Sequence, residues 1–214
     1  MSVIALAIRV VLIGCVVGLL ATPAHSEDAK PSGSAAATPV DDFAKEYKDF
    51  KERLTALPKK IEDTSRSVEG QTAAASTHQQ LNALRAIVST ALAQVADNGA
   101  VAKMGQTALN YTRRKLSDLQ QDTHYTKDQR EYLIKEWTAT SRLTAGAVDE
   151  LEASRKELAD LLKVLQSNDD FLKELEQLNN AAKTVEVIRD LTAGLREISG
   201  HLKIILQRMN SPSM

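Results

Sequence analysis

The chain has 214 residues, with 27 basic and 28 acidic side chains, one cysteine, nine glycines and five prolines. The formal net charge of −1 gives no positive field that would attract phosphates, which excludes the simplest nucleic-acid-binding interpretation. The single cysteine excludes an internal disulfide framework and a cysteine-rich zinc site. Between Val40 and Ser211 there are only one proline and six glycines, too few turn residues for a β-sandwich or an α/β protein, so we expect an all-α fold.

Residues 1–26 have the pattern of an export signal. Arg9 supplies a positive charge ahead of the apolar run 10–21, and small residues precede a cleavage site between Ser26 and Glu27. The run is shorter than the roughly 20 apolar residues of a membrane-spanning helix. We therefore expect a signal peptide that is cleaved after Ser26, with an uncleaved anchor as the alternative, and a periplasmic or secreted bacterial protein.

A second signal competes within this segment. Residues 12–15 (LIGC) resemble a bacterial lipobox, in which Cys15 would become the lipidated N-terminus. The apolar run before Cys15 is short, and the residues that follow stay apolar where a tether should be polar, so cleavage after Ser26 is the preferred interpretation. The mature chain would then be cysteine-free, with 26 basic and 28 acidic residues, and only a lipidated Cys15 would give it a membrane contact after processing.

Composition divides the rest of the chain into three parts. Residues 27–38 are small and polar and indicate a flexible tether, and residues 211–214 indicate a disordered tail. Residues 39–210 are expected to form a single helical-bundle domain. Thr38, Pro39 and Asp41 have the spacing of a capping box with proline at the first helical position, which predicts the start of the first helix.

Apolar residues of the first stretch alternate in steps of three and four, which is a heptad pattern. They are Val40, Phe43, Tyr47, Phe50, Leu54, Leu57, Ile61 and Val68. Pro58 lies inside this run and predicts a kink or a break between two helices. A second stretch covers 71–121, and Asn98-Gly99 marks a stop or a tight turn within it. Whether 71–121 forms one bent helix or two remains open at this stage.

Thr126 and Gln129 form another capping box, and a long regular heptad stripe follows it. The stripe consists of Leu133, Trp137, Thr140, Thr144, Ala147, Leu151, Ser154, Leu158, Leu161 and Leu165. We expect Ser167 and Asp170 to cap the last helix, with 167–169 as the turn before it. The apolar set predicted for that helix is Phe171, Leu175, Leu178, Ala182, Val185, Ile188, Leu195, Ile198, Leu202, Ile205 and Met209.

Two helices of about forty residues would each be about 60 Å long and, joined by so short a turn, would fold back on each other. The sequence therefore predicts an elongated antiparallel three- or four-helix bundle with coiled-coil-like heptad packing.

No spacing of chemistry-bearing residues points to an enzyme. The three histidines outside the leader form no His-x-x-x-His or Glu-x-x-His pattern, and no nucleophile motif or phosphate-binding glycine loop is present in the sequence. Glu197 and His201 are four residues apart and are expected to form a surface ion pair. The basic run 113–115 has tyrosines and a tryptophan nearby, but a solvated helix face explains it better than nucleic-acid binding. We expect no catalytic residue, no metal site and no cofactor.

Two groups of residues carry the sharper hypotheses. Phe43, Tyr47 and Phe50 concentrate aromatic rings on one helix directly after the tether, which indicates either core packing or a face that docks on a partner or on a second copy. The small and hydroxylated residues Thr140, Thr144, Ala147 and Ser154 interrupt a leucine-rich stripe. They indicate either close helix approach or a small ligand cavity in mid-bundle.

The leading functional hypothesis is a non-enzymatic exported helical bundle that acts through protein–protein contacts in an envelope or secretion assembly. The expected partner is a protein of the cell envelope or a second copy of the chain. The alternative is a ligand-binding or chaperone-like periplasmic bundle.

Overall fold

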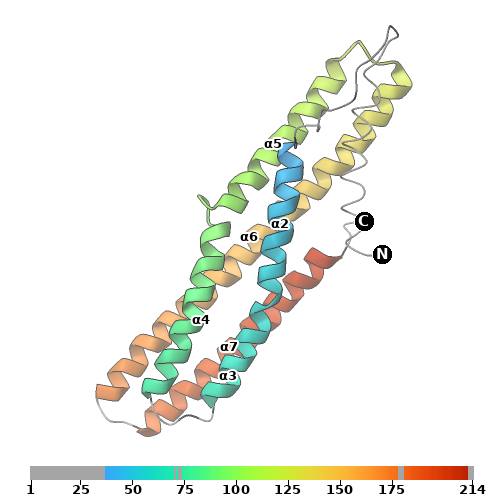
Figure 1. Cartoon of the computed structure of the whole chain (residues 1–214). Coiled ribbons are helices and arrows are strands. Elements are labelled where there is room, and N and C mark those ends of the chain that lie inside the picture. Colours follow the sequence, from blue (N-terminus) through green and yellow to red (C-terminus); the bar gives the residue numbers. More distant parts are fainter. Residues whose placement is uncertain (1–36, 70, 72–73, 178–180, 212–214) are drawn as a thin grey trace, which may run out of the picture.

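The computed structural model describes residues 37–69, 71, 74–177 and 181–211, and all of its regular structure is helical. Four long helices pack against one another, and two shorter ones extend the arrangement: α2 (Pro39–Thr55), α3 (Leu57–Glu69), α4 (Ala74–Val95), α5 (Ala100–Gln121), α6 (Lys127–Gln177) and α7 (Ala181–Asn210). The molecule is elongated, and α6 runs along most of its length (Figure 1). At 1.5 Å per residue, the 51 residues of α6 span about 76 Å.

The capping boxes explain where two helices begin. The Thr38 hydroxyl accepts from the backbone N–H of Asp41 at 3.3 Å, and the Asp41 carboxylate accepts from the backbone N–H of Thr38 at 3.0 Å. Thr126 and Gln129 exchange the same pair of bonds ahead of α6, at 3.1 and 3.3 Å. Both predicted helix starts are confirmed.

Pro58 lies at a break rather than inside one bent helix. α2 ends at Thr55, and α3 begins at Leu57, so that Pro58 occupies the first turn of α3, where its missing N–H has no intrahelical partner to lose. Pro58 is itself buried. The two helices still run end to end along one side of the molecule (Figure 1).

The stretch 71–121 forms two helices, α4 and α5, with Gly99 between them. A Cβ atom on Gly99 would lie 2.3 Å from the Gln94 carbonyl oxygen, so only glycine fits this tight turn. Both helices pack along α6, and α2 packs on α5.

The turn predicted at 167–169 is wrong. α6 continues through these residues to Gln177, and Asp170 caps no helix. As a result, the apolar residues predicted to be buried at the start of the last helix are not the buried ones. Phe171 is 44% exposed and Val185 48% exposed, whereas Leu172, Val187 and Leu191 are buried in their place. From Ile188 onward the predicted residues are buried; Leu178 and the side chain of Leu175 lie outside the described residues.

The core is one continuous cluster of aliphatic side chains. Nine of the ten positions of the predicted α6 stripe are buried, and Ala147 is half-buried. α3 and α7 pack side by side. Hydrogen bonds join successively later residues of α2 and α3 to successively earlier residues of α7. Lys51 Nζ donates to the Met209 carbonyl at 3.1 Å, Ser199 Oγ to the Pro58 carbonyl at 3.3 Å, and Ser65 Oγ to the Thr192 carbonyl at 3.4 Å.

Candidate functional site

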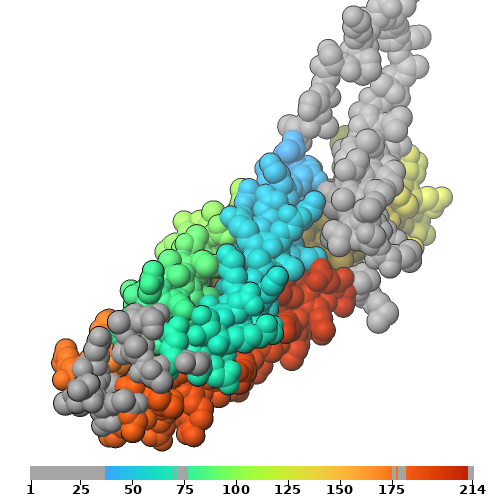
Figure 2. All heavy atoms as spheres, turned by 60° about the horizontal axis from the view of Figure 1, so that its bottom comes forward, coloured from blue at the N-terminus to red at the C-terminus, as the bar shows by residue number. Residues whose placement is uncertain are grey.

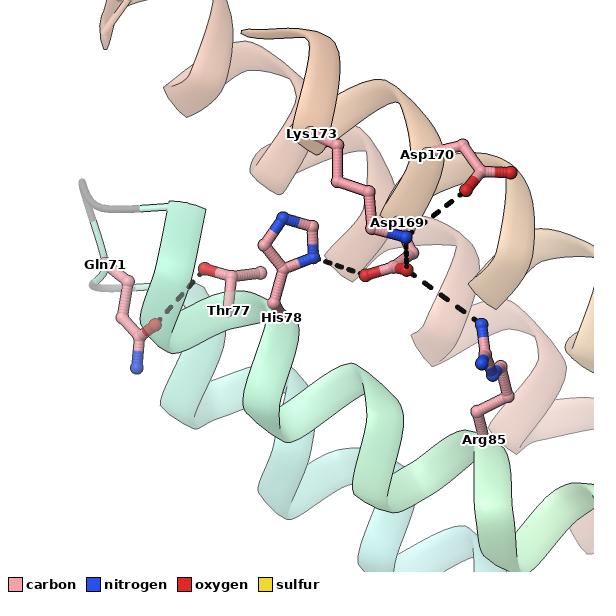
Figure 3. A network of polar contacts seen from close by, with 7 residues as sticks. All are labelled: Gln71, Thr77, His78, Arg85, Asp169, Asp170 and Lys173. Atoms are coloured by element: carbon pink, nitrogen blue, oxygen red, sulfur yellow. Dashed lines mark hydrogen bonds and ion pairs between the residues drawn. The ribbon is translucent and has the colours of Figure 1, made fainter. Parts of the chain in front are cut away.

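A group of basic side chains around one buried carboxylate joins α4 to the C-terminal part of α6 (Figure 3). Asp169 has only 2% of its side chain exposed, and it interacts with three basic side chains. His78 Nδ1 contacts Oδ1 of Asp169, Lys173 Nζ donates to Oδ2 at 2.7 Å, and Arg85 Nη1 lies 3.9 Å from Oδ2. We refer to His78, Arg85, Asp169 and Lys173 as the Asp169 cluster.

Helix periodicity brings the members of the Asp169 cluster together. Asp169 and Lys173 are four residues apart on α6 and so share a face. His78 and Arg85 are seven residues apart on α4, which is two helical turns, so both side chains approach α6 from the same face. The cluster therefore requires two continuous helices lying side by side, and it fixes their register.

The electrostatics favour the ionised form of Asp169. Burial alone would raise the pKa of Asp169, but the hydrogen bonds from Lys173 and His78 outweigh it and leave the pKa below its usual value. The bond from Asp169 raises the pKa of Lys173 above its usual range. Lys173 is about half exposed, whereas Asp169 is buried, so removing the basic partners would leave a buried carboxylate without compensation. The cluster is best described as an electrostatic tie between α4 and α6.

An imidazole beside a carboxylate is also a component of catalytic dyads, which need a nucleophile within reach of the imidazole. The neighbouring hydroxyl in Figure 3 is that of Thr77, which donates to Gln71 Oε1 at 3.2 Å. Among the residues drawn in Figure 3, the cluster has a carboxylate and an imidazole, and the Thr77 hydroxyl donates to Gln71 rather than to His78.

A second set of polar contacts ties α3 to α7. Glu62 pairs with Lys203, and Glu69 pairs with Arg196. The pKa of Glu62 is lowered chiefly by the hydrogen bond from Lys203, which outweighs the opposing effect of burial. These pairs are partly exposed, so each contributes little to stability and serves mainly to set the register.

The end of α7 meets α2 and α6 at a polar junction. Lys51 donates to the Met209 carbonyl, and Arg208 Nε lies 3.6 Å from Glu150 Oε1. Burial, followed by the charge of Glu150, raises the pKa of Tyr47 well above its usual value. Beyond this junction α7 stops, and the upper part of the bundle in Figure 1 is built from α2, α5 and α6.

The predicted docking face on α2 lies inside the fold. Phe43 and Phe50 are 3% and 1% exposed, and Tyr47 is half-buried with its ring centroid 5.7 Å from that of Phe43. Phe43 also contacts α5 closely: a Cβ atom on Gly105 would lie 3.1 Å from its ring. In this conformation the aromatic group is core packing between α2 and its neighbours, and the two phenylalanines are not available to a partner.

The hydroxyls proposed to line a mid-bundle cavity bond to their own helix. Thr140 donates to the Glu136 carbonyl at 3.0 Å, Thr144 to the Thr140 carbonyl at 2.9 Å, and Ser154 to the Glu150 carbonyl at 2.8 Å. The three side chains are buried, and Ala147 is half-buried. This geometry fits close helix approach, and a ligand at this position stays a prediction.

The remaining predicted residues are placed as follows. His201 pairs with Glu157 of α6 at 3.3 Å rather than with Glu197, and His124 contacts Asp122 at 2.9 Å. The expected cleavage site at Ser26 and Glu27 lies outside the described residues.

Sequence reasoning missed His78 and Asp169 as partners. The one available signal was the four-residue spacing of Asp169 and Lys173, which fits a continuing helix.

Within the described ranges, no three histidine, cysteine or acidic side chains lie close enough together to hold a metal ion. In the same part of the chain, no helix is both long and apolar enough to cross a membrane. Searches of protein-family models, curated proteins and solved structures find no match to this chain.

Proposed function

We propose that this protein is an exported, non-enzymatic helical bundle that acts through protein–protein contacts in the cell envelope or in a secretion assembly. The export signal expected in residues 1–26 and the tether in 27–38 motivate the location. The main observation behind the proposed mode of action is the long, rod-like bundle. Its aliphatic core is continuous, and polar contacts join its helices to one another.

The finer architecture belongs to the same proposal. We infer an antiparallel bundle in which heptad stripes pack in the manner of a coiled coil. The opposite numbering of the α3–α7 contacts and the buried stripe on α6 support this arrangement. A rod of this kind offers a large surface for its volume, which suits contact with extended partners.

Cell fractionation combined with intact mass measurement tests the location and the assembly together. The chain is expected in the envelope or periplasmic fraction, with Glu27 as its first residue, and in a complex larger than one chain under native conditions. A chain that keeps residues 1–26 and stays in the cytoplasmic fraction as a single copy would contradict the proposal.

A further inference from the structure

We propose that Asn98, at the junction between α4 and α5, is a site of spontaneous deamidation whose rate is set by local opening of that junction. The inference is independent of the proposed function. Asn98-Gly99 is the only Asn-Gly pair in the sequence, and Asn98 is exposed. Figures 1 and 2 both place α4 and α5 along one outer edge of the molecule, so the junction between them lies at the surface.

The reaction needs only water in addition to the chain itself. The backbone nitrogen of Gly99 attacks the side-chain amide carbon of Asn98, the bond from that carbon to its own nitrogen breaks, and the proton of the Gly99 N–H leaves with that nitrogen as ammonia. Water then opens the resulting succinimide ring at either carbonyl, which gives aspartate or isoaspartate. Glycine favours the attack because no Cβ atom shields its nitrogen.

The turn itself requires the glycine that makes Asn98 reactive. A Cβ atom on Gly99 would lie 2.3 Å from the Gln94 carbonyl oxygen and 2.6 Å from that of Ala93, so no other residue fits there. The reactive pair is therefore a consequence of how closely the chain turns between α4 and α5.

The folded junction restrains the attacking nitrogen. The Gly99 N–H donates to the Ala96 carbonyl at 2.6 Å, and Gly99 is buried. Because the nitrogen gives up this proton when it attacks, the bond must break first, which requires the junction to open locally. Arg155 of α6 opposes that opening, since its guanidinium donates to the carboxylate of Asp97, the residue next to Asn98.

The two products should affect the fold differently. Aspartate at position 98 adds a negative charge ahead of α5, which has no acidic residue in its first turn and no side-chain cap, so the charge itself is tolerated. Isoaspartate instead adds an extra carbon to the main chain. Both α4 and α5 pack on α6, with Arg155 on one side of the junction and the contact of Gly105 with Val148 on the other. An added main-chain atom should therefore disturb the packing of one helix on α6.

The test follows conversion in the chain isolated from cells, incubated at one mildly alkaline pH in buffer and in urea. Peptide mass spectrometry measures deamidation at Asn98, and labelling by an isoaspartyl methyltransferase measures the isoaspartate. Asn110, which is exposed in α5 and precedes a tyrosine, is the internal control.

Two variants separate local opening from a general loss of ion pairs. Arg155→Gln removes the bond to Asp97. The matched control Arg196→Gln removes the pair with Glu69 that joins α7 to α3, far from the junction in the chain. Circular dichroism establishes that each variant is helical, and Asp97→Ala replaces Arg155→Gln if the latter fails to fold.

We expect Asn98 to convert in urea and to convert at least about tenfold more slowly in buffer, which corresponds to a local opening free energy of about 1.4 kcal/mol or more. Arg155→Gln should raise the rate in buffer, and Arg196→Gln should leave it unchanged. The isoaspartate form should unfold at a lower urea concentration than the wild type, and Asn98→Asp should not. No conversion at Asn98 in urea would overturn the site. Equal rates in buffer and urea, or a rate that Arg155→Gln does not change, would overturn its control by the junction.

Discussion

Replacing Gly105 by alanine probes a close contact among α2, α5 and α6. A Cβ atom there would lie 3.0 Å from Val148 Cγ2 and 3.1 Å from the Phe43 ring, closer than ordinary van der Waals contact. Alanine in place of glycine stabilises a helix interior by about 1 kcal/mol. Overpacking a well-packed core costs about 1–3 kcal/mol. We therefore expect Gly105→Ala to lower the free energy of unfolding by about 0–2 kcal/mol.

Gly200 provides the matched control for Gly105. It is also inside a helix, but a Cβ atom there would meet nothing within 4 Å. Gly200→Ala should thus raise the free energy of unfolding by about 1 kcal/mol, the full gain in helix propensity. The two substitutions differ only in their surroundings, so the difference between them, about 1–3 kcal/mol, measures the strain at Gly105.

Urea denaturation followed by far-ultraviolet circular dichroism measures both values by linear extrapolation. In a double-mutant cycle, Phe43→Leu should cost less in the Gly105→Ala background than in the wild type, because the smaller side chain relieves the clash. If Gly105→Ala stabilises the protein as much as Gly200→Ala does, the three helices do not pack as closely as described, and the reasoning is refuted.

Three further substitutions test other parts of the structure by the same denaturation assay. Leu158 is fully buried, so Leu158→Ala should lower the free energy of unfolding by about 2–5 kcal/mol. A decrease below about half a kcal/mol, the size of a surface effect, would mean that the α6 stripe does not face the core. Asp169→Asn should cost about 1–3 kcal/mol at neutral pH. The pKa of Asp169 is lowered in the folded state, so the ionised carboxylate stabilises the protein above the unfolded pKa of about 3.9, and this stabilisation is lost as the pH falls through the folded pKa. Asp169→Asn should therefore lose that part of the wild type's sensitivity to acid. An unchanged dependence of stability on pH would argue against an electrostatic tie between α4 and α6. Pro58→Ala should lower stability by about 0.4–1 kcal/mol through the unfolded chain and leave helicity unchanged; a clear gain in helicity would show that Pro58 interrupts a continuous helix.

Local patterns in the sequence predicted much of the fold. Apolar spacing identified the buried stripe of α6 through Leu165, and the capping boxes at Thr38 and Thr126 identified two helix starts. These features depend on residues within one or two turns of each other. They could be predicted because helix periodicity and backbone hydrogen bonding act at short range in the chain.

The failures came where distant residues decide the local structure. Ser167 and Asp170 have the composition of a helix start, but Asp169 between them is held by His78, which lies 91 residues earlier in the chain. The continuous α6 places Asp169 beside His78 and one turn before Lys173. No pattern within α6 indicates His78 as the partner. For Phe43 the sequence left core packing and docking as alternatives, and only the fold shows that α5 lies against the ring.

The functional proposal is tested most directly by site-specific photo-crosslinking in living cells. A photoreactive phenylalanine analogue at Tyr132, which is 52% exposed, samples α6, and one at Ile87, which is 37% exposed, samples α4. The proposal predicts discrete crosslinked species in the envelope fraction. A chain that yields no discrete crosslink from either position, in cells where it is exported and folded, would contradict the claim that this protein acts through contacts made by its surface.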